Sequence, residues 1–593
     1  MFSIVNVIFT INTFGSKIMK DNVIIQRIWQ FAKLYKWAFL ISYTVLVLEL
    51  IFDQLLPVFL SDVINYAVYD ADIPKFLLSS LWYMLIFFGY AACGYIQLQL
   101  WQRLNNKYIY DIRIACYKKV LRLKPTVLAD IKTGDVIRTI NNDAAEFHHI
   151  IQRYAMRIIN AGIGTVFSLI IVAVMKWEIA LFMLIVIPVS VLISKQIETK
   201  MKSVSDELRN KQGKYSAWLM EILKGMREVK LFVAEKTVLR HFMQKNHDIV
   251  RSSVKQDTLQ FQSNQIINGI YFCANLIFYI LCAFFVANGS INIGEYVAIA
   301  SYFSMVNSNI RKVLHGNVEY QRRKTCVERV LKLLDAEEEN EFGLSPLTVT
   351  EGDIAIENLS FGYDTKKPVL QDLNLRILAG EKIGVVGVSG AGKSTFANLL
   401  LKLYEPQQGR ICIDGKNLSE CKYSSVRQAV GIVNQENILF NMSVRDNITF
   451  GSPATDEMLW SILEKVHLKD EIEQLPNKLD SILGNGGSAL SGGQNQRLCI
   501  ARLIFRDPKI IILDEATSAL DPVSENIVQA ALEALVDGRT TIIISHRYKA
   551  LLHTDRILVL HNGEQVGYAH YDTLMAENKY FADMFAKQKE VTI

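Results

Sequence analysis

Six apolar stretches, each long enough to cross a lipid bilayer, lie within the first 320 residues of this 593-residue chain. A bilayer core about 30 Å thick requires roughly 20 apolar residues in each helix that spans it. The stretches run over 37–60, 76–100, 154–175, 178–195, 266–288 and 293–314. The third and fourth nearly merge across Lys176, which predicts an antiparallel hairpin. No stretch after residue 340 is long enough, so the chain divides into a membrane half and a soluble half.

Composition excludes several classes of protein. Half of the residues are apolar and 21% are charged, against a usual ~25%, which argues against disorder and against an ordinary soluble enzyme. The eight cysteines include no Cys-x-x-Cys pair, so a thiolate zinc site has no support. The net charge of +5 is not massed in one block, and we therefore expect no nucleic-acid partner.

The basic residues of the loops predict the orientation in the membrane. They are frequent before the first stretch, between the second and third, and between the fourth and fifth, whereas the opposite loops hold only Lys75 and Lys176. Both termini and the soluble half should therefore be cytoplasmic. The two long basic connections have helical periodicity and predict cytoplasmic extensions of the membrane helices, with tips at 128–139 and 216–224. The alternative is unstructured loops, which are uncommon above about 15 residues.

These features predict four segments. An N-terminal segment covers 1–22, and a transmembrane domain covers 23–324, beginning with an amphipathic helix over 23–37 that lies at the membrane interface. A linker covers 325–347 and contains the acidic run from Glu337 to Glu341. The soluble domain covers 348–593.

The soluble half contains a phosphate-binding loop. Residues 387–394 read GVSGAGKS and match G-x-x-x-x-G-K-[ST] in full, between a predicted strand at 383–386 and a predicted helix at 396–403. Backbone N–H groups and the helix N-terminus attract phosphates there. We expect Lys393 to pair with the β- and γ-phosphates of ATP and the Ser394 hydroxyl to bind Mg²⁺. The predicted nucleotide contacts of this loop are Gly387, Ser389, Gly390, Gly392, Lys393, Ser394 and Thr395.

Two further patterns extend this chemistry. An apolar strand at 510–513 ends in Asp514 and Glu515; beside a phosphate-binding loop, one acid can hold Mg²⁺ and the other can polarise the attacking water. Ser491 and two glycines open a helix about twenty residues earlier. They form either a simple helix cap or a second anion-binding nest. Because one phosphate-binding loop has little use for a second nest on the same face, we expect the nest to serve the nucleotide of a partner subunit.

The ordered motifs resemble those of half-size ABC exporters of the type IV, six-span kind, over nearly the whole chain after residue 20. The motifs are Tyr363, 387–394, Gln435, 490–494, Asp514 with Glu515, 518–521 and His546. The resemblance implies a six-span α-helical transmembrane domain with long cytoplasmic helical extensions, followed by an α/β P-loop ATPase domain with a helical subdomain. Residues 133–143 resemble the first coupling loop of such exporters. The loop at 484–487 lacks the acidic and basic residues that are frequent there in the family, which bears on coupling and not on hydrolysis.

The resemblance also implies roles for single residues. Tyr363 would stack on adenine, and Gln435 would contact Mg²⁺ and relay the state of the nucleotide site to the membrane half. The partner's ATP would be closed in by Ser491, Gly492, Gly493 and Gln494. Glu515 would be the catalytic base, Asp521 would lie in the D-loop, and His546 would hold the γ-phosphate. The implied Mg²⁺ contacts are Ser394, Gln435 and Asp514.

The implied activity is ATP-driven export of an amphipathic small molecule, peptide or lipid by alternating access, in a multi-pass protein of a bacterial inner membrane. A second half-transporter completes two ATP sites at the interface; a homodimer is favoured over a heterodimer. Two alternatives use the same fold: an ATP-gated channel or regulator, and an importer.

Two acids mark a candidate substrate site. Glu49 and Asp53 stand four residues apart in the first stretch and therefore on one helix face. Acids at membrane depth are costly and usually face a cavity or a partner. They either attract a cationic or amphipathic substrate or pair with polar side chains of neighbouring helices.

Overall fold

The computed structural model describes residues 26–27, 29–150, 157–364, 367–435, 437–484, 490–515, 522–545 and 547–589. The chain forms two compact units. The first holds the chain up to Leu121 together with Lys132–Ala336, and the second holds Arg122–Ile131 together with the chain from Glu337 onward.

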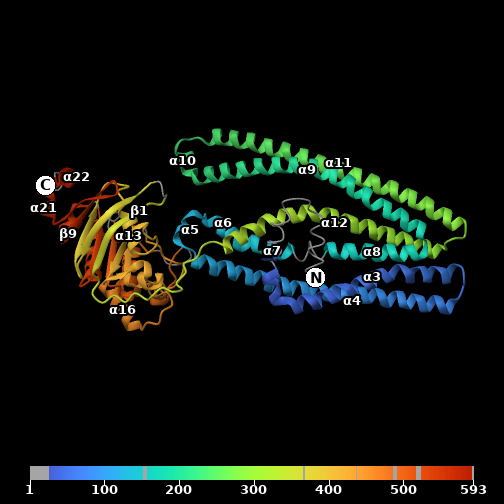
Figure 1. Ribbon diagram of the computed structural model, residues 1–593, viewed down its shortest axis with the longest axis horizontal. Helices are drawn as coiled ribbons and strands as arrows, with labels where there is room; N and C mark the ends of the chain where they lie inside the picture. Colours follow the sequence, from blue (N-terminus) through green and yellow to red (C-terminus); the bar gives the residue numbers. More distant parts are fainter. Residues whose placement is uncertain are drawn as a thin grey trace. The chain divides into compact units, whose positions relative to one another are not determined.

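The first unit is made of long helices that run side by side (Figure 1). These are α3 (Lys36–Val68), α4 (Ile73–Arg122), α8 (Arg157–Met175), α9 (Trp177–Lys224), α11 (Glu235–Ala287) and α12 (Ile293–Leu334). Apolar stretches of this length form helices because a helix satisfies its own backbone N–H and C=O groups where no water can. The short interval between α8 and α9, which pack against each other, confirms the predicted hairpin across Lys176. Of the interfacial helix predicted over 23–37, residues 26–27 and 29–37 are described, and all are helical, with the 3-10 turn η1 (Lys33–Tyr35) among them.

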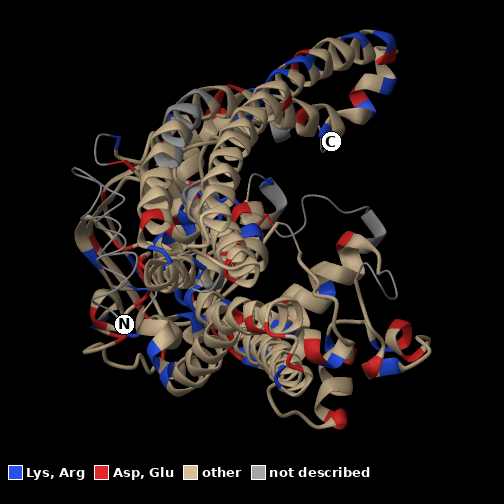
Figure 2. Cartoon of the chain, turned by 90° about the vertical axis from the view of Figure 1, so that its right-hand side faces the viewer, with Lys and Arg blue, Asp and Glu red and all other residues tan. Residues whose placement is uncertain are grey.

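Membrane-spanning character is clear for four helices in the described part of the chain. The segments Trp29–Val68, Ile73–Arg122, Arg157–Met175 and Glu235–Ala287 are long and apolar enough to cross a membrane. In α9 the apolar part is shorter, Trp177–Val189. Wherever they are described, all six predicted stretches fall in helices except for Asn288, in the turn directly after α11. Figure 2 shows long stretches of these helices without charged residues. The number of six spans stays a prediction.

Short helices interrupt the long ones at two tips. After α4 the chain forms α5 (Pro125–Asp130), α6 (Thr133–Arg138), the π-helix η2 (Thr139–Asp143) and α7 (Ala144–His149). This turn begins earlier than predicted because Pro125 disfavours a helical conformation in the residue before it. The second predicted tip, at 216–224, is wrong: α9 continues to Lys224, and Gly225, a poor helix former, ends it before α10 (Met226–Leu231).

The second unit is organised around a ten-stranded sheet in the order β5-β4-β1-β2-β10-β9-β3-β8-β7-β6. The strands are β1 (Ile354–Phe361), β2 (Leu370–Ile377), β3 (Lys382–Val386), β4 (Gln408–Ile413), β5 (Lys416–Asn417), β6 (Val430–Val433), β7 (Ile510–Asp514), β8 (Thr540–Ile544), β9 (Arg556–His561) and β10 (Glu564–Ala569). Strands β6, β7, β8, β3 and β9 pair in parallel, whereas β1 is antiparallel to β2 and β4. Because parallel strands end at the same edge, the residues that follow β3, β6 and β7 are brought together.

Helices pack around this sheet. They are α13 (Lys393–Leu400), α14 (Tyr423–Ala429), α15 (Val444–Thr449), α16 (Asp456–Lys465), α17 (Lys469–Glu473), α18 (Gly492–Arg506), α19 (Pro522–Val536), α20 (Tyr548–Leu551), α21 (Tyr571–Glu577) and α22 (Lys579–Lys589), with the 3-10 turns η4 (Leu418–Glu420) and η5 (Lys478–Asp480). The core around α13 includes Phe396 and Leu400 packed with strand residues such as Ile354. A separate core joins α15 to α19 and contains Leu498 and Val528. The second unit is therefore an α/β domain with a helical subdomain, as the resemblance implied.

Candidate functional site

The phosphate-binding loop lies between β3 and α13, in the predicted strand–loop–helix order. Gly392 has φ +103° and precedes the first helical residue, a conformation that L side chains rarely adopt. A Cβ on Gly387 would lie 2.5 Å from the backbone oxygen of Leu560. These two glycines allow the loop to bend tightly, so that its backbone N–H groups can face an anion. Ser389, Gly390 and Ser394 are exposed, whereas Thr395 is buried.

Lys393 is buried at the start of α13, and its ammonium group donates to loop carbonyl oxygens. Its Nζ lies 2.9 Å from the Gly387 oxygen and 3.1 Å from the Val388 oxygen. Burial lowers the pKa of Lys393, and the carboxylates of Glu515 and Asp514 oppose that shift. The lysine and the two acids are therefore close enough to interact electrostatically.

The two acids lie at the end of β7, at the edge of the sheet that carries the phosphate-binding loop. Asp514 pairs with Ile544 in the register of β7 and β8, and the Glu515 amide donates to the Ile544 oxygen at 3.0 Å. Glu515 has φ +49°, a region in which a residue other than glycine is uncommon and which is enriched at functional sites. Gln435 follows the neighbouring strand β6 and is exposed.

Tyr363 lies beside the phosphate-binding helix. Its ring is 57% exposed, and its hydroxyl is 3.1 Å from the Thr395 hydroxyl. Tyr404 packs edge-on against it with ring centroids 5.1 Å apart. Sequence reasoning missed Tyr404, since nothing in the local sequence distinguishes it from a core tyrosine. The arrangement leaves a supported, accessible aromatic face next to the loop.

Ser491 begins α18 as a helix cap. Its hydroxyl accepts from the Gln494 amide at 3.3 Å, and the Gln494 side chain accepts from the Ser491 amide at 2.8 Å, which together form a capping box. Gly492 is exposed and Gly493 is buried. The hydrophobic core of α18 is distinct from the core of α13. Within the single chain, the structure therefore gives this segment the cap geometry, with no hydrogen bond or ion pair to the phosphate-binding loop among the described residues. Of the other predicted site residues, Asp521 and His546 lie outside the described residues.

The two membrane acids are partly buried on α3. A Cβ on Gly94 would lie 3.3 Å from Glu49 Oε1, which places that carboxylate against α4. Asp53 is within electrostatic range of Lys312 on α12. Neither acid has an ion pair within 4 Å among the described residues.

Other polar residues of the membrane helices contact one another across neighbouring helices. Gln54 is buried, and its side chain accepts from the Ser168 hydroxyl at 2.9 Å, while the Tyr302 hydroxyl donates to its backbone oxygen at 2.5 Å. Lys312 donates to Asn309 at 3.1 Å, and the Arg311 guanidinium lies 4.4 Å from the centre of the Tyr271 ring. For Gln54 and Lys312, the sequence signal was a polar residue within a long apolar helix. Gln54 is thus held by hydrogen bonds to neighbouring helices, whereas no such bond is formed by Glu49 or Asp53 within the part of the chain that the structure describes.

Comparisons with known proteins agree with this arrangement. Residues 370–518 match the family model described as ABC transporter, and residues 39–310 match the ABC transporter transmembrane region. The chain is 31% identical over 575 residues to a Staphylococcus aureus protein named as a multidrug export ATP-binding/permease protein, covering 95% of this chain and all of that protein. It is also 31% identical over 485 residues to the ATP-dependent lipid A-core flippase of Alcanivorax borkumensis, covering 80% of this chain and 82% of the flippase. In fold, it is similar to a bacterial Atm1-family ABC exporter with ATP bound, with a TM-score of 0.78, 23% identity, and coverage of 94% of this chain and 99% of that one.

Proposed function

Because the chain belongs to the ABC exporters, which couple ATP hydrolysis to transport across a membrane, we propose that two copies of it form a homodimer that exports a cationic, amphipathic small molecule. The observation that supports the ATP chemistry most directly is that the phosphate-binding loop follows β3 and the two acids end β7, and that both strands pair in parallel with β8. Lys393 and the acids therefore lie at one edge of the sheet, where the carboxylates act electrostatically on the ammonium group. Binding of ATP would draw the Lys393 ammonium group from its own loop carbonyls to the β- and γ-phosphates. The exposed ring of Tyr363 would stack on the adenine.

The donor set fits Mg²⁺. Ser394 offers an exposed hydroxyl in the first turn of α13, and Gln435 and Asp514 offer side-chain oxygens at the ends of adjacent strands. Mg²⁺ prefers oxygen ligands and usually takes only a few from the protein, with the remainder from phosphate and water. When bound, the ion would neutralise charge on the phosphates. The protein groups orient those phosphates toward Glu515, which would accept the proton of the attacking water.

Removal of one metal ligand gives a first prediction. Ser394→Ala deletes a hydroxyl ligand, so we expect the Mg²⁺ concentration for half-maximal ATP hydrolysis to rise at least ~10-fold. Titration of phosphate release against Mg²⁺, at constant ATP, measures the shift. Ser452→Ala, at an exposed loop serine of the same unit, is the control and should leave the curve unchanged. An unchanged curve for Ser394→Ala would remove this residue from the metal site.

A second chain is needed because the parts of the site are divided. The nest at Ser491–Gln494 belongs to a different core from the phosphate-binding loop, so in the dimer it would close on the partner's ATP. The tip between α10 and α11 also has an exposed apolar surface, with Leu231, Phe232 and Val233 between 65% and 80% exposed. Contiguous exposed apolar residues indicate an interaction surface, and the second copy would cover them.

Transport in vesicles tests the whole proposal. Inside-out vesicles that contain the protein should accumulate a lipophilic cation when ATP is added outside, which also requires the ATPase unit to lie on the cytoplasmic side. Uptake in the opposite direction would indicate an importer. Ion current without ATP-dependent uptake would indicate a gated channel. Because relatives are named for lipid A-core and multidrug export, amphipathic compounds should be the first substrates tested in these vesicles.

The membrane acids give the prediction that concerns substrate charge. Replacement of both Glu49 and Asp53 by their amides should weaken the apparent affinity for a quaternary ammonium dye about 10-fold or more, because an opposite charge in a partly desolvated site contributes several kcal/mol. The affinity for an uncharged analogue of the same dye should change less than about two-fold, since no charge is lost. Substrate-stimulated ATP hydrolysis measures both affinities.

The matched control is Asp62→Asn. Asp62 also lies on α3, nine residues beyond Asp53 and therefore on the opposite helix face. Equal losses for both dyes, or the same loss in the Asp62 variant, would contradict a role for charge at Glu49 and Asp53.

A further inference from the structure

The linker between the two units is not a free tether. Residues 325–334 of the predicted linker belong to α12, and the rest follows that helix. There, Glu337 to Glu339 pair with residues 122–124 at the end of α4. Leu123 and Glu338 form an antiparallel bridge. The Glu339 amide donates to the Arg122 oxygen at 2.8 Å, and the Lys124 amide donates to the Glu337 oxygen at 3.2 Å. In addition to this backbone pairing, Lys124 and Glu337 form an ion pair of 2.8 Å.

The same short stretch is fastened to the helix α14 of the second unit. Glu339 forms a two-point ion pair with Arg427, one contact of which is 2.9 Å. Glu341 accepts from the Ser424 amide in the first turn of α14 at 2.8 Å. Charge-assisted bonds of this kind are strong and fix orientation. Linker residues 337–341 therefore hold the end of α4 on one side and α14 on the other.

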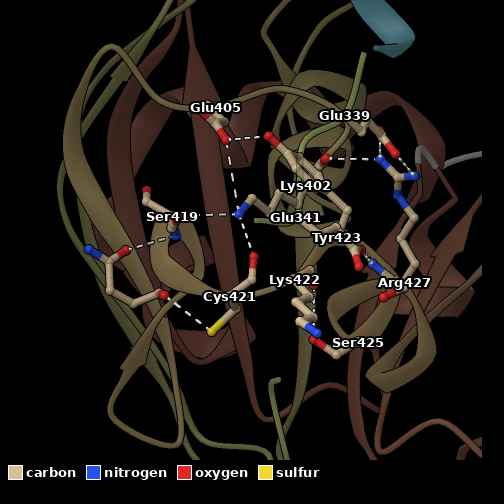
Figure 3. A network of polar contacts seen from close by, with 12 residues as sticks. Glu339, Glu341, Lys402, Glu405, Ser419, Cys421, Lys422, Tyr423, Ser425 and Arg427 are labelled. Carbon is tan, nitrogen blue, oxygen red and sulfur yellow. Dashed lines mark hydrogen bonds and ion pairs between the residues drawn. The ribbon is translucent and has the colours of Figure 1, made fainter. Parts of the chain in front are cut away.

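From Arg427 the contacts continue to the far end of the phosphate-binding helix. Arg427 donates to the backbone oxygen of Lys402 at 3.2 Å, and Lys402 comes directly after the last turn of α13. Figure 3 shows Arg427 facing Glu339 and the Lys402 side chain turned toward the segment that ends at Cys421. The helix whose first residue is Lys393 of the phosphate-binding loop is thus followed, two residues beyond its end, by a residue of the linker network.

The position of Lys402 is itself closely fixed. Its side chain is 2% exposed, and its Nζ donates to the Cys421 oxygen at 2.6 Å and to the Ser419 oxygen at 3.2 Å. The ammonium group also lies 4.4 Å from the centre of the Tyr423 ring, and the Tyr423 hydroxyl donates to Glu405 at 2.9 Å. A buried ammonium with several partners resists displacement, because any movement would leave a buried charge unsatisfied. A shift of α13 would therefore move Lys402 and its partners together with the helix.

We propose that linker residues 337–341 form a strap that couples the phosphate-binding helix to two membrane helices, α4 and α12, within one chain. Glu339 and Arg427 are the positioning pair of this strap, and neither is among the residues assigned above to the nucleotide or substrate sites. Movement of α13 on ATP binding is transmitted through Arg427 to the strap, and from there to the end of α4 and, along the chain, to α12. Loss of the pair leaves hydrolysis intact and separates it from transport.

The test measures coupling and hydrolysis separately. Glu339→Gln removes the charge of the pair and keeps the shape of the side chain. We expect transported substrate per hydrolysed ATP to fall about 5-fold or more, the scale of a typical coupling between sites, while basal ATP hydrolysis stays within about two-fold. The thermal unfolding midpoint should match that of the unmodified protein. The reversed pair, E339R with R427E, should recover at least part of the coupling.

The control is Glu357→Gln, which breaks an exposed pair with Arg410 of 2.7 Å in the same unit and should leave coupling unchanged. A parallel fall of hydrolysis, unfolding midpoint and transport in Glu339→Gln would overturn the strap, because it would mean that the pair only stabilises the fold. Unchanged coupling would overturn it as well.

A second variant avoids the partly buried pair. Lys124→Glu places a like charge opposite Glu337 at an exposed position and should lower coupling, as Glu339→Gln does. Arg410→Glu makes the same change at the exposed control pair and should leave coupling unchanged. Coupling that is unchanged by Lys124→Glu would contradict the part of the proposal that concerns α4.

Discussion

The Glu515→Gln variant is expected to bind ATP and to hydrolyse it at least ~10²-fold more slowly than the unmodified protein, the usual contribution of a positioned general base. Glutamine keeps the size and most of the hydrogen bonding of glutamate but cannot accept the proton of the attacking water. The backbone that holds this side chain should be unaffected, because the Glu515 amide donates to Ile544 whatever the side chain. The variant should therefore accumulate with ATP bound.

Two measurements separate binding from chemistry. Phosphate release gives the hydrolysis rate, and equilibrium binding of a fluorescent ATP analogue gives the affinity, which should change less than about three-fold, since Glu515 acts on the water and not on the ground-state nucleotide. Glu533→Gln, at an exposed acid on α19, serves as the control and should hydrolyse normally. Normal turnover in Glu515→Gln would assign the base to another residue.

How far the sequence predicted this site depends on whether its parts are local. The phosphate-binding loop is a continuous motif between a strand and a helix, so Lys393 and Ser394 could be placed from eight residues alone. Asp514 and Glu515 lie more than one hundred residues later, yet an acid at the end of an apolar strand implies a position at the shared edge of a parallel sheet. Both inferences used rules that need no knowledge of side-chain packing.

Other features had no local signal. The second tip was misplaced because helical periodicity continues through 216–224 and stops only at Gly225. The ion pair of Glu339 with Arg427 joins residues 88 positions apart, and the sequence presents Glu339 as one acid in a polar run. Lys402 would be expected at the surface, and its burial depends on backbone oxygens at 419 and 421 that only the folded chain supplies.

A mixture of two inactive variants should recover activity if the ATP sites are shared between chains. Lys393→Ala removes the phosphate ligand of the loop. Gly492→Asp places a carboxylate in the nest at the start of α18, where it repels the γ-phosphate. The fold should tolerate it, because a Cβ at Gly492 meets no atom within 4 Å and an acid in the first helical turn is favourable. Each variant alone should therefore be a folded, inactive homodimer.

In a mixed dimer the two defects fall in the same site. The altered loop of one chain faces the altered nest of the other, and the second site is intact. With equal amounts and free exchange, half of the dimers are mixed and each has one working site, so ~25% of the sites should trap ATP, as expected for a symmetric two-fold assembly. Trapping of labelled ATP is the better measurement, since it requires only one closed site, and hydrolysis is recorded alongside it.

The control replaces the aspartate by its neutral isostere. Gly492→Asn has nearly the same shape without the charge and should retain much more activity on its own, which separates repulsion of the phosphate from steric obstruction. Differently tagged chains, purified in two steps, ensure that mixed dimers are present. If those purified mixed dimers trap no ATP, each chain must complete its own site, and the second copy would then have no part in nucleotide chemistry. If they trap ATP, the nest of one chain serves the nucleotide of the other, and because both parts come from identical chains, no different half-transporter is required.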